Sequence, residues 1–150
     1  SSDVCSSDLD ANLLFITRSL NDLLKHSALN SNSSLVVISS IWQDFARNNK
    51  FSYSVSKSAL AGFVRSAAVD LGPKKIRVNS VSPGVILNEM TQKNLSANQI
   101  DKFESETPLR KLVTETEIVN VISWLLSDKS GGVTGQNIVV DGGWTVARYV

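Results

Sequence analysis

Three residues whose types suit alcohol–ketone chemistry lie near one another in this sequence: Ser40, Tyr53 and Lys57. Tyr53 and Lys57 are four residues apart, so in a helix they share one face and the ammonium can lie beside the phenol. A nearby cation stabilises phenolate and brings proton transfer by a tyrosine closer to neutral pH. A serine hydroxyl from a neighbouring strand end could hold a carbonyl oxygen against that phenol. The trio therefore predicts a proton-transfer site for alcohol–ketone interconversion.

The spacing of Tyr53 and Lys57 decides little by itself. Lysine and arginine together number 15 among 150 residues, so such a pair arises easily by chance on a solvated helix face. The elements that position the two side chains must therefore decide whether they form a site.

The surrounding segments alternate between helix and strand. Hydrophobic residues at helical spacing predict helices, and short β-branched runs predict strands that are covered on both faces. The expected elements are a helix over about 9–28, a strand over 35–39, a helix over 52–71, a strand over 76–81, a polar flap over 88–112 with weak helical character near 96–105, a helix over 114–126 that a Thr114/Glu117 capping box opens, and a strand over 137–141. Ligands bind beyond the carboxyl ends of such strands, where Ser40 and Pro83 lie.

This alternation predicts an α/β fold with a parallel sheet and helical crossovers. A free-standing sheet of three parallel strands would expose its edges, so the fold looks incomplete and an N-terminal half is expected to be missing. The polar segment 1–9 contains the only cysteine and resembles the translation of a DNA-sequencing adapter. We interpret it as non-native; the alternative is a natural disordered N-terminus.

The overall composition argues against several function classes. The formal net charge is +1 with scattered basic residues, so no nucleic-acid partner is predicted. No apolar run approaches the roughly 20 residues that cross a bilayer, so no membrane partner is predicted. One cysteine and one histidine support neither a disulfide framework nor a protein-built metal site. We expect a reduced, soluble, cytoplasmic protein.

Five segments, in order and at matching separations, resemble the short-chain dehydrogenase/reductase family, especially its members similar to 3-oxoacyl-carrier-protein reductase. The resemblance covers about 10–145, and it implies the C-terminal half of a doubly wound, Rossmann-like domain over 10–150. The segments are Asn12, Val37-Ile38-Ser39-Ser40, Tyr53-Ser54-Val55-Ser56-Lys57, Arg77-Val78-Asn79-Ser80-Val81-Ser82-Pro83-Gly84-Val85-Ile86, and Thr134-Gly135-Gln136 with Val140-Asp141-Gly142-Gly143.

The resemblance implies a role for each candidate site residue. Tyr53 would be the general acid in reduction and the base in oxidation, and Lys57 would assist it and hydrogen-bond the nicotinamide ribose. Ser40 would position the substrate oxygen, and Asn12 would hold a water that links Lys57 to solvent. The backbone at Pro83, Gly84, Val85 and Ile86 would contact the nicotinamide. The implied cofactor is NAD or NADP, the substrate is a small carbonyl or alcohol, and the assembly is a homotetramer or homodimer.

Several alternatives stay open at this point. Asn12 could be only a polar residue of a helix start, and Ser39 could face the site in place of Ser40. Pro83 and Gly84 could form only a turn. Trp42 and Trp144 could line a substrate pocket or fill a core or interface.

The sequence also departs from the family pattern. The glycine-rich phosphate turn is absent, so the chain alone is expected to bind dinucleotide poorly and to be inactive. Gln43 stands where glycine is common, and Asn88 replaces a common threonine. A competing hypothesis is therefore a catalytically inactive half-domain that acts as an interaction or oligomerisation module through the helices over 9–28 and 52–71.

Overall fold

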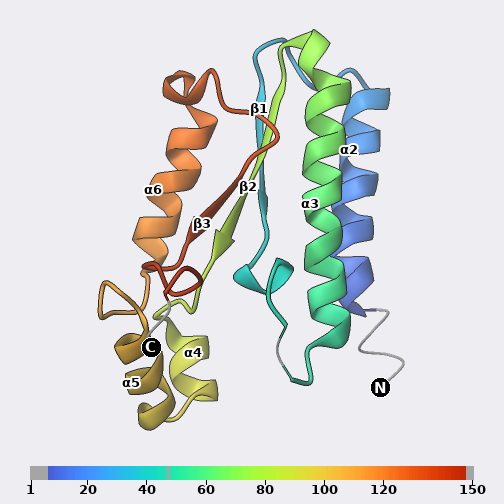
Figure 1. Ribbon diagram of the computed structural model, residues 1–150. Helices are drawn as coiled ribbons and strands as arrows, with labels where there is room; N and C mark the ends of the chain where they lie inside the picture. Colours follow the sequence, from blue (N-terminus) through green and yellow to red (C-terminus); the bar gives the residue numbers. More distant parts are fainter. Residues whose placement is uncertain (1–6, 47, 148–150) are drawn as a thin grey trace.

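A three-stranded parallel sheet forms the centre of the molecule (Figure 1). The computed structural model describes residues 7–46 and 48–147. Strands β1 (Ser34–Ile38), β2 (Arg77–Pro83) and β3 (Asn137–Val140) lie in the order β1-β2-β3, and both neighbouring pairs run parallel. The parallel α/β fold predicted from the sequence is therefore confirmed.

Helices cover both faces of this sheet (Figure 1). Helices α2 (Phe15–Lys25) and α3 (Phe51–Leu71) lie on one face, and α6 (Glu115–Leu126) lies on the other. Consecutive side chains of a strand point to opposite faces. Val37 of β1 accordingly packs with α3, whereas the preceding Val36 packs with the cluster that α6 contributes to. Both faces of β1 thus contact a hydrophobic cluster, as its continuous β-branched sequence predicted, although Ile38 at its end is 44% exposed.

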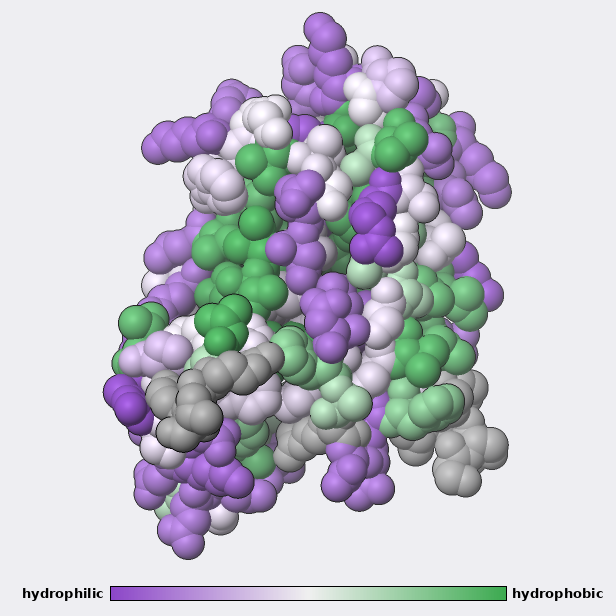
Figure 2. Space-filling view, viewed as in Figure 1, coloured by the Kyte–Doolittle hydropathy of each residue, from purple (hydrophilic) through white to green (hydrophobic). Residues whose placement is uncertain are grey.

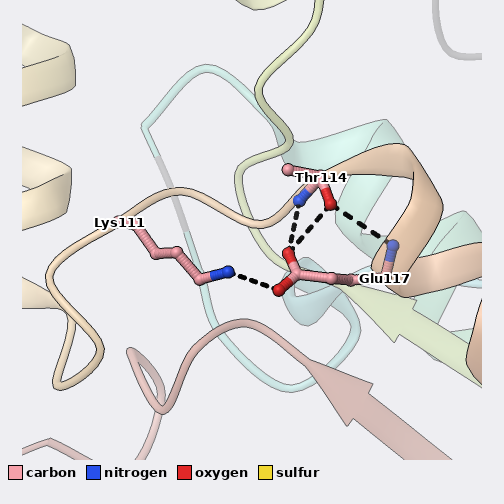
Figure 3. A network of polar contacts seen from close by, with 3 residues as sticks. All are labelled: Lys111, Thr114 and Glu117. Atoms are coloured by element: carbon pink, nitrogen blue, oxygen red, sulfur yellow. Dashed lines mark hydrogen bonds and ion pairs between the residues drawn. The ribbon is translucent and has the colours of Figure 1, made fainter.

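The N-terminus of α6 is fixed by the predicted capping box (Figure 3). The Thr114 Oγ1 accepts a hydrogen bond from the Glu117 N–H at 3.3 Å, and Glu117 Oε2 accepts one from the Thr114 N–H at 2.9 Å. Lys111 forms an ion pair with the same carboxylate. The hydrogen bond from Lys111, followed by those from Thr114, lowers the pKa of Glu117 to about 2.

The segment 88–112 contains two helices where the sequence predicted a polar flap with weak helical character. Helix α4 (Glu89–Asn94) is capped by the Asn88 side chain, and α5 (Ala97–Glu106) begins with a capping box at Ser96. These side chains satisfy N–H groups of the first turn, a local effect that hydrophobic periodicity does not detect.

The first predicted helix has a change of winding near its start. Residues 10–14 form a π-helical turn, η1 (Asp10–Leu14), and α2 follows it directly. Residues 7–9 continue the helix upstream, whereas residues 1–6 of the segment 1–9 lie outside the described residues. Within the described ranges, no helix is long and apolar enough to span a membrane.

Candidate active site

The ends of all three strands meet at one edge of the sheet. The ladder extends one residue past β1, where the Ser39 N–H donates to the Val81 carbonyl at 2.8 Å. It also extends past β2, where the Gly84 N–H donates to the Val140 carbonyl at 2.9 Å. The predicted serine and the predicted Pro-Gly turn therefore lie at the same carboxyl edge, where ligands of parallel sheets bind.

Ser40 is buried and begins a short 3₁₀ helix, η2 (Ile41–Gln43). Its Oγ accepts a long hydrogen bond of 3.3 Å from the Trp42 N–H. The neighbouring Ser39 donates its hydroxyl proton to Gln43 Oε1 at 2.9 Å. The hydroxyl proton of Ser40 has no acceptor among the described residues, so Ser40 is better placed than Ser39 to donate to a substrate oxygen.

Lys57 is buried in the first turns of α3, with 8% of its surface exposed. Its Nζ lies 5.6 Å from the centroid of the Tyr53 ring and donates to the Ile38 carbonyl at 3.1 Å. Burial lowers the pKa of Lys57 below its usual 10.5, and the charge of Asp8 opposes that shift. The structure thus brings Tyr53 and Lys57 together beside the end of β1, because Ile38 is the last residue of that strand and precedes Ser40 by two residues.

Tyr53 is half-buried in the first turn of α3. Its hydroxyl makes no hydrogen bond to any residue that the structure describes, so the phenol can bond to a substrate. Its backbone carbonyl accepts a hydrogen bond of 2.8 Å from the Ser56 hydroxyl.

Asn12 lies in the π-helical turn, and its Nδ2 donates to Ser56 Oγ at 3.3 Å. Single π turns within helices are frequent at functional sites. Asn12 therefore contacts α3 through Ser56, with no direct hydrogen bond to Lys57. Sequence reasoning missed Ser56, which is fully buried next to Lys57. Its only sequence signal is its place inside the Tyr-x-x-x-Lys segment.

The turn after β2 is tightly held from both sides. A Cβ on Gly84 would lie 2.7 Å from the Asp141 Cβ and 2.9 Å from its Cα, so glycine is needed for this close approach. Ile86 forms a parallel bridge with Val113, and the Leu87 N–H donates to the same residue at 2.8 Å. The segment from Pro83 to Ile86 therefore presents a fixed backbone at the carboxyl edge, next to the end of β3.

The two tryptophans that the sequence left open line a cavity. The Trp42 and Trp144 rings meet edge to face with centroids 5.8 Å apart, and both side chains are half-buried. Both also line a cavity of about 400 Å³ at the carboxyl edge. The pocket interpretation is therefore favoured over simple core packing.

Comparison with known proteins identifies the family. A family model described as enoyl-(acyl carrier protein) reductase matches residues 5–145. A solved short chain dehydrogenase family protein from Francisella tularensis is 33% identical, with a TM-score of 0.83 over 93% of this chain and 61% of that chain. The chain belongs to the short-chain dehydrogenase/reductase family. The predicted family and the predicted Rossmann-like fold are both confirmed.

Other members of the short-chain dehydrogenase/reductase family place this chain within the longer fold. It is 34% identical over 138 residues to 3-oxoacyl-(acyl-carrier-protein) reductase FabG of Buchnera aphidicola, covering 92% of this chain and 56% of that protein. It also matches 4-hydroxyisoleucine dehydrogenase complexed with NADH, with 32% identity and a TM-score of 0.85 over 99% of this chain and 62% of that chain. The chain spans about half the length of the curated relatives it matches. At the level of the family, the predicted nicotinamide cofactor is confirmed.

Proposed function

We propose that the protein to which this chain belongs is an NAD(P)-dependent oxidoreductase that interconverts a carbonyl and a secondary alcohol. The observation that carries the proposal is the buried Lys57 ammonium 5.6 Å from the Tyr53 ring, beside the strand end that presents Ser40. A phenol next to a cation, with a serine hydroxyl two residues beyond the carbonyl that the cation bonds to, is a set of groups suited to moving one proton to or from a substrate oxygen.

Tyr53 is the acid/base in this proposal. In reduction its phenol donates a proton to the carbonyl oxygen, and in oxidation its phenolate accepts the alcohol proton. Ser40 donates a hydrogen bond to the same oxygen and stabilises negative charge that develops there. Lys57 stabilises the phenolate through its positive charge.

The nicotinamide cofactor, when bound, supplies or accepts the hydride. The residues present fit its nicotinamide end: Lys57 uses one of three N–H donors on the Ile38 carbonyl, which leaves donors for a ribose hydroxyl. The backbone of Pro83, Gly84, Val85 and Ile86 would contact the nicotinamide from the end of β2.

Asn12 is the positioning residue of the proposal. Its bond to Ser56 fixes the first turns of α3, and its carboxamide oxygen is available to hold a water that resupplies protons to Lys57. The chain alone is expected to bind dinucleotide weakly, because no glycine-rich turn cradles the pyrophosphate. Isothermal titration of the 150-residue chain with NADPH tests that expectation, and tight binding would contradict it.

The Tyr53→Phe substitution tests the catalytic assignment. It removes only the hydroxyl, so we expect activity to fall by about 10²–10⁴-fold with an unchanged fold. The assay is NAD(P)H oxidation with a ketone, in a gene product that includes this chain and a glycine-rich turn. Thermal unfolding of the same variant is the control. Retained activity would overturn the assignment.

A second candidate is the inactive half-domain that docks onto a full-length homologue. Exposed hydrophobic side chains support it: Phe15 on α2 is 67% exposed, and Phe51 and Val69 on α3 are 79% and 75% exposed. Figure 2 shows hydrophobic surface over these two helices. The same surface suits a homotetramer or homodimer of the complete enzyme. The DNA upstream of the codon for Asp10 discriminates, since an open frame that encodes a glycine-rich turn favours the enzyme.

A further inference from the structure

An aromatic pocket lies at the carboxyl edge of the sheet, and one of its walls, Trp42, follows Ser40 by two residues. Its walls include Trp42, Phe103 and Trp144, and its volume is about 400 Å³. The Phe103 and Trp144 rings are tilted by 50° with centroids 5.8 Å apart, and Trp42 meets Trp144 edge to face. An apolar cavity of about 150 Å³ already holds benzene, so this pocket has room for an aromatic ring and the carbon that bears its carbonyl.

Three separate segments hold these rings in place. Trp42 belongs to η2, and its N–H donates to Ser40 Oγ. Phe103 lies on α5, and Thr107 directly follows that helix. Thr107 packs closely against Gly142, since a Cβ on this glycine would lie 2.7 Å from the Thr107 Cγ2. Trp144 follows the Gly142-Gly143 turn. The Asp141 carboxylate accepts hydrogen bonds of 2.8 Å from the Gly143 N–H and from the Thr145 N–H. The pocket is therefore pre-organised by close packing between α5 and the end of β3.

The charges in the pocket wall are already paired. Lys102 Nζ lies 3.8 Å from Glu106 Oε1, and Glu106 Oε2 accepts a hydrogen bond of 3.3 Å from Trp144 Nε1. The wall thus offers one cation and one anion that offset each other. A ligand with net charge would lose hydration without gaining an unpaired partner, so a neutral ligand is favoured.

We propose that this aromatic pocket binds the aryl ring of a neutral aryl ketone or aryl secondary alcohol and so sets the substrate class. The inference rests on the proposed function, because that ring would carry the carbonyl whose oxygen Ser40 and Tyr53 are proposed to bind. Aromatic rings prefer edge-to-face and offset contacts with other rings. The three walls provide such contacts for a flat ring and provide fewer for a linear alkyl chain of equal carbon number.

The indole N–H signals of the protein test this proposal directly. The chain has three tryptophans, and Trp124 lies on α6 away from the pocket, so it serves as an internal reference. We would titrate the ¹⁵N-labelled chain with acetophenone and, separately, with 2-octanone, which has the same number of carbons. Acetophenone should shift the Trp42 and Trp144 signals at about tenfold lower concentration than 2-octanone and leave Trp124 unmoved.

Two variants make the test specific. Phe103→Ala should weaken acetophenone binding by about tenfold, whereas Phe15→Ala on α2 should leave it unchanged. Ala46→Phe places a ring in the pocket without removing a packed side chain and should block binding. Equal shifts at Trp124, tighter binding of 2-octanone, or binding that survives both pocket variants would overturn the proposal.

Failure of the pocket and failure of the proposed function give different results. Binding needs no hydride transfer, so the unmodified chain should bind acetophenone in the absence of NAD(P)H. Selective acetophenone binding without NAD(P)H oxidation in the longer protein would support the pocket and contradict the oxidoreductase. Oxidation of NAD(P)H with 2-octanone as efficient as with acetophenone, with no binding preference, would contradict the pocket alone.

Discussion

Each end of the sheet holds a cation, and the two cations differ in the number of hydrogen-bond acceptors that they contact. At the amino end, the Arg77 guanidinium donates to four acceptors, which are the Leu125 carbonyl at 2.9 Å, Ser130 Oγ at 2.9 Å, the Ser127 carbonyl at 3.0 Å and the Val133 carbonyl at 3.5 Å. At the carboxyl end, Lys57 donates to the Ile38 carbonyl alone within the described part of the chain.

This difference is the one expected between a structural cation and a cation with the catalytic role proposed for Lys57. Arg77 ties the last carbonyls of α6 to the start of β2, where helix carbonyls lack partners within the helix. Lys57 keeps N–H donors in reserve, although burial makes its charge costly and lowers its pKa. A buried ammonium with few partners adds little to the fold, so its position beside Tyr53 points to chemistry.

The largest expected effect comes from removing the charge at the carboxyl end. Lys57→Met in the longer protein should reduce kcat/KM by about 10²–10⁴-fold, because the phenolate of Tyr53 loses its cation. Steady-state NAD(P)H oxidation measures this loss. Lys74→Met removes an exposed lysine of the 3₁₀ helix η3 (Gly72–Lys74), which follows α3, and serves as the control. If Lys57→Met and Lys74→Met have the same kcat/KM, the charge of Lys57 has no role in the reaction.

Removing the Arg77 cation at the amino end should lower the stability of the fold and leave the reaction rate unchanged. Arg77→Met leaves carbonyls at the end of α6 without their donor, so we expect the free energy of unfolding to fall by about 3 kcal/mol. Chemical denaturation measures the change. Arg65→Met on the exposed side of α3 is the matched control. A loss no larger than that of Arg65→Met would mean that the Arg77 bonds are not structural.

Much of the carboxyl end could be predicted from the sequence, because its key relations are local or periodic. Tyr53 and Lys57 share a face at helical spacing, and the strand end at Ser40 follows a continuous β-branched run. The α6 cap was likewise visible in Thr114 and Glu117, three residues apart. Local spacing of this kind is preserved in the fold.

The amino end could not be predicted, because its contacts cross long stretches of sequence. Arg77 bonds to groups 48–56 residues away, and no periodicity marks such partners. The same holds for the bond from Asn12 to Ser56 and for Phe103, which reaches Trp144 across the sheet edge. Tertiary packing decides these contacts, so only the folded chain reveals them.

A smaller effect is expected from the backbone next to the site. Gly84→Ala should lower the free energy of unfolding by about 2 kcal/mol, because its Cβ would meet Asp141 at 2.7 Å. Gly62→Ala is the matched control: nothing lies within 4 Å of its Cβ, and within α3 it should stabilise by about 0.5–1 kcal/mol. Chemical denaturation of both variants tests whether the backbone at the carboxyl end is rigid. If Gly84→Ala changes the free energy of unfolding no more unfavourably than Gly62→Ala, the turn after β2 accommodates the added Cβ and is not rigid.

The smallest expected effect is a pH dependence that only the carboxyl-end cation has. The pKa of Lys57 is lowered in the folded chain, because burial outweighs the opposing charge of Asp8. The unfolded chain therefore binds that proton more tightly, and the free energy of unfolding should rise with pH between the lowered pKa and the usual 10.5. Lys57→Met should lose this rise, whereas Arg77→Met should keep it, since a guanidinium stays charged throughout that range. Denaturation curves at several pH values from neutral upward provide the measurement. If wild type and Lys57→Met run parallel across that range, burial imposes no cost on the lysine charge, and the contrast between the two cations fails.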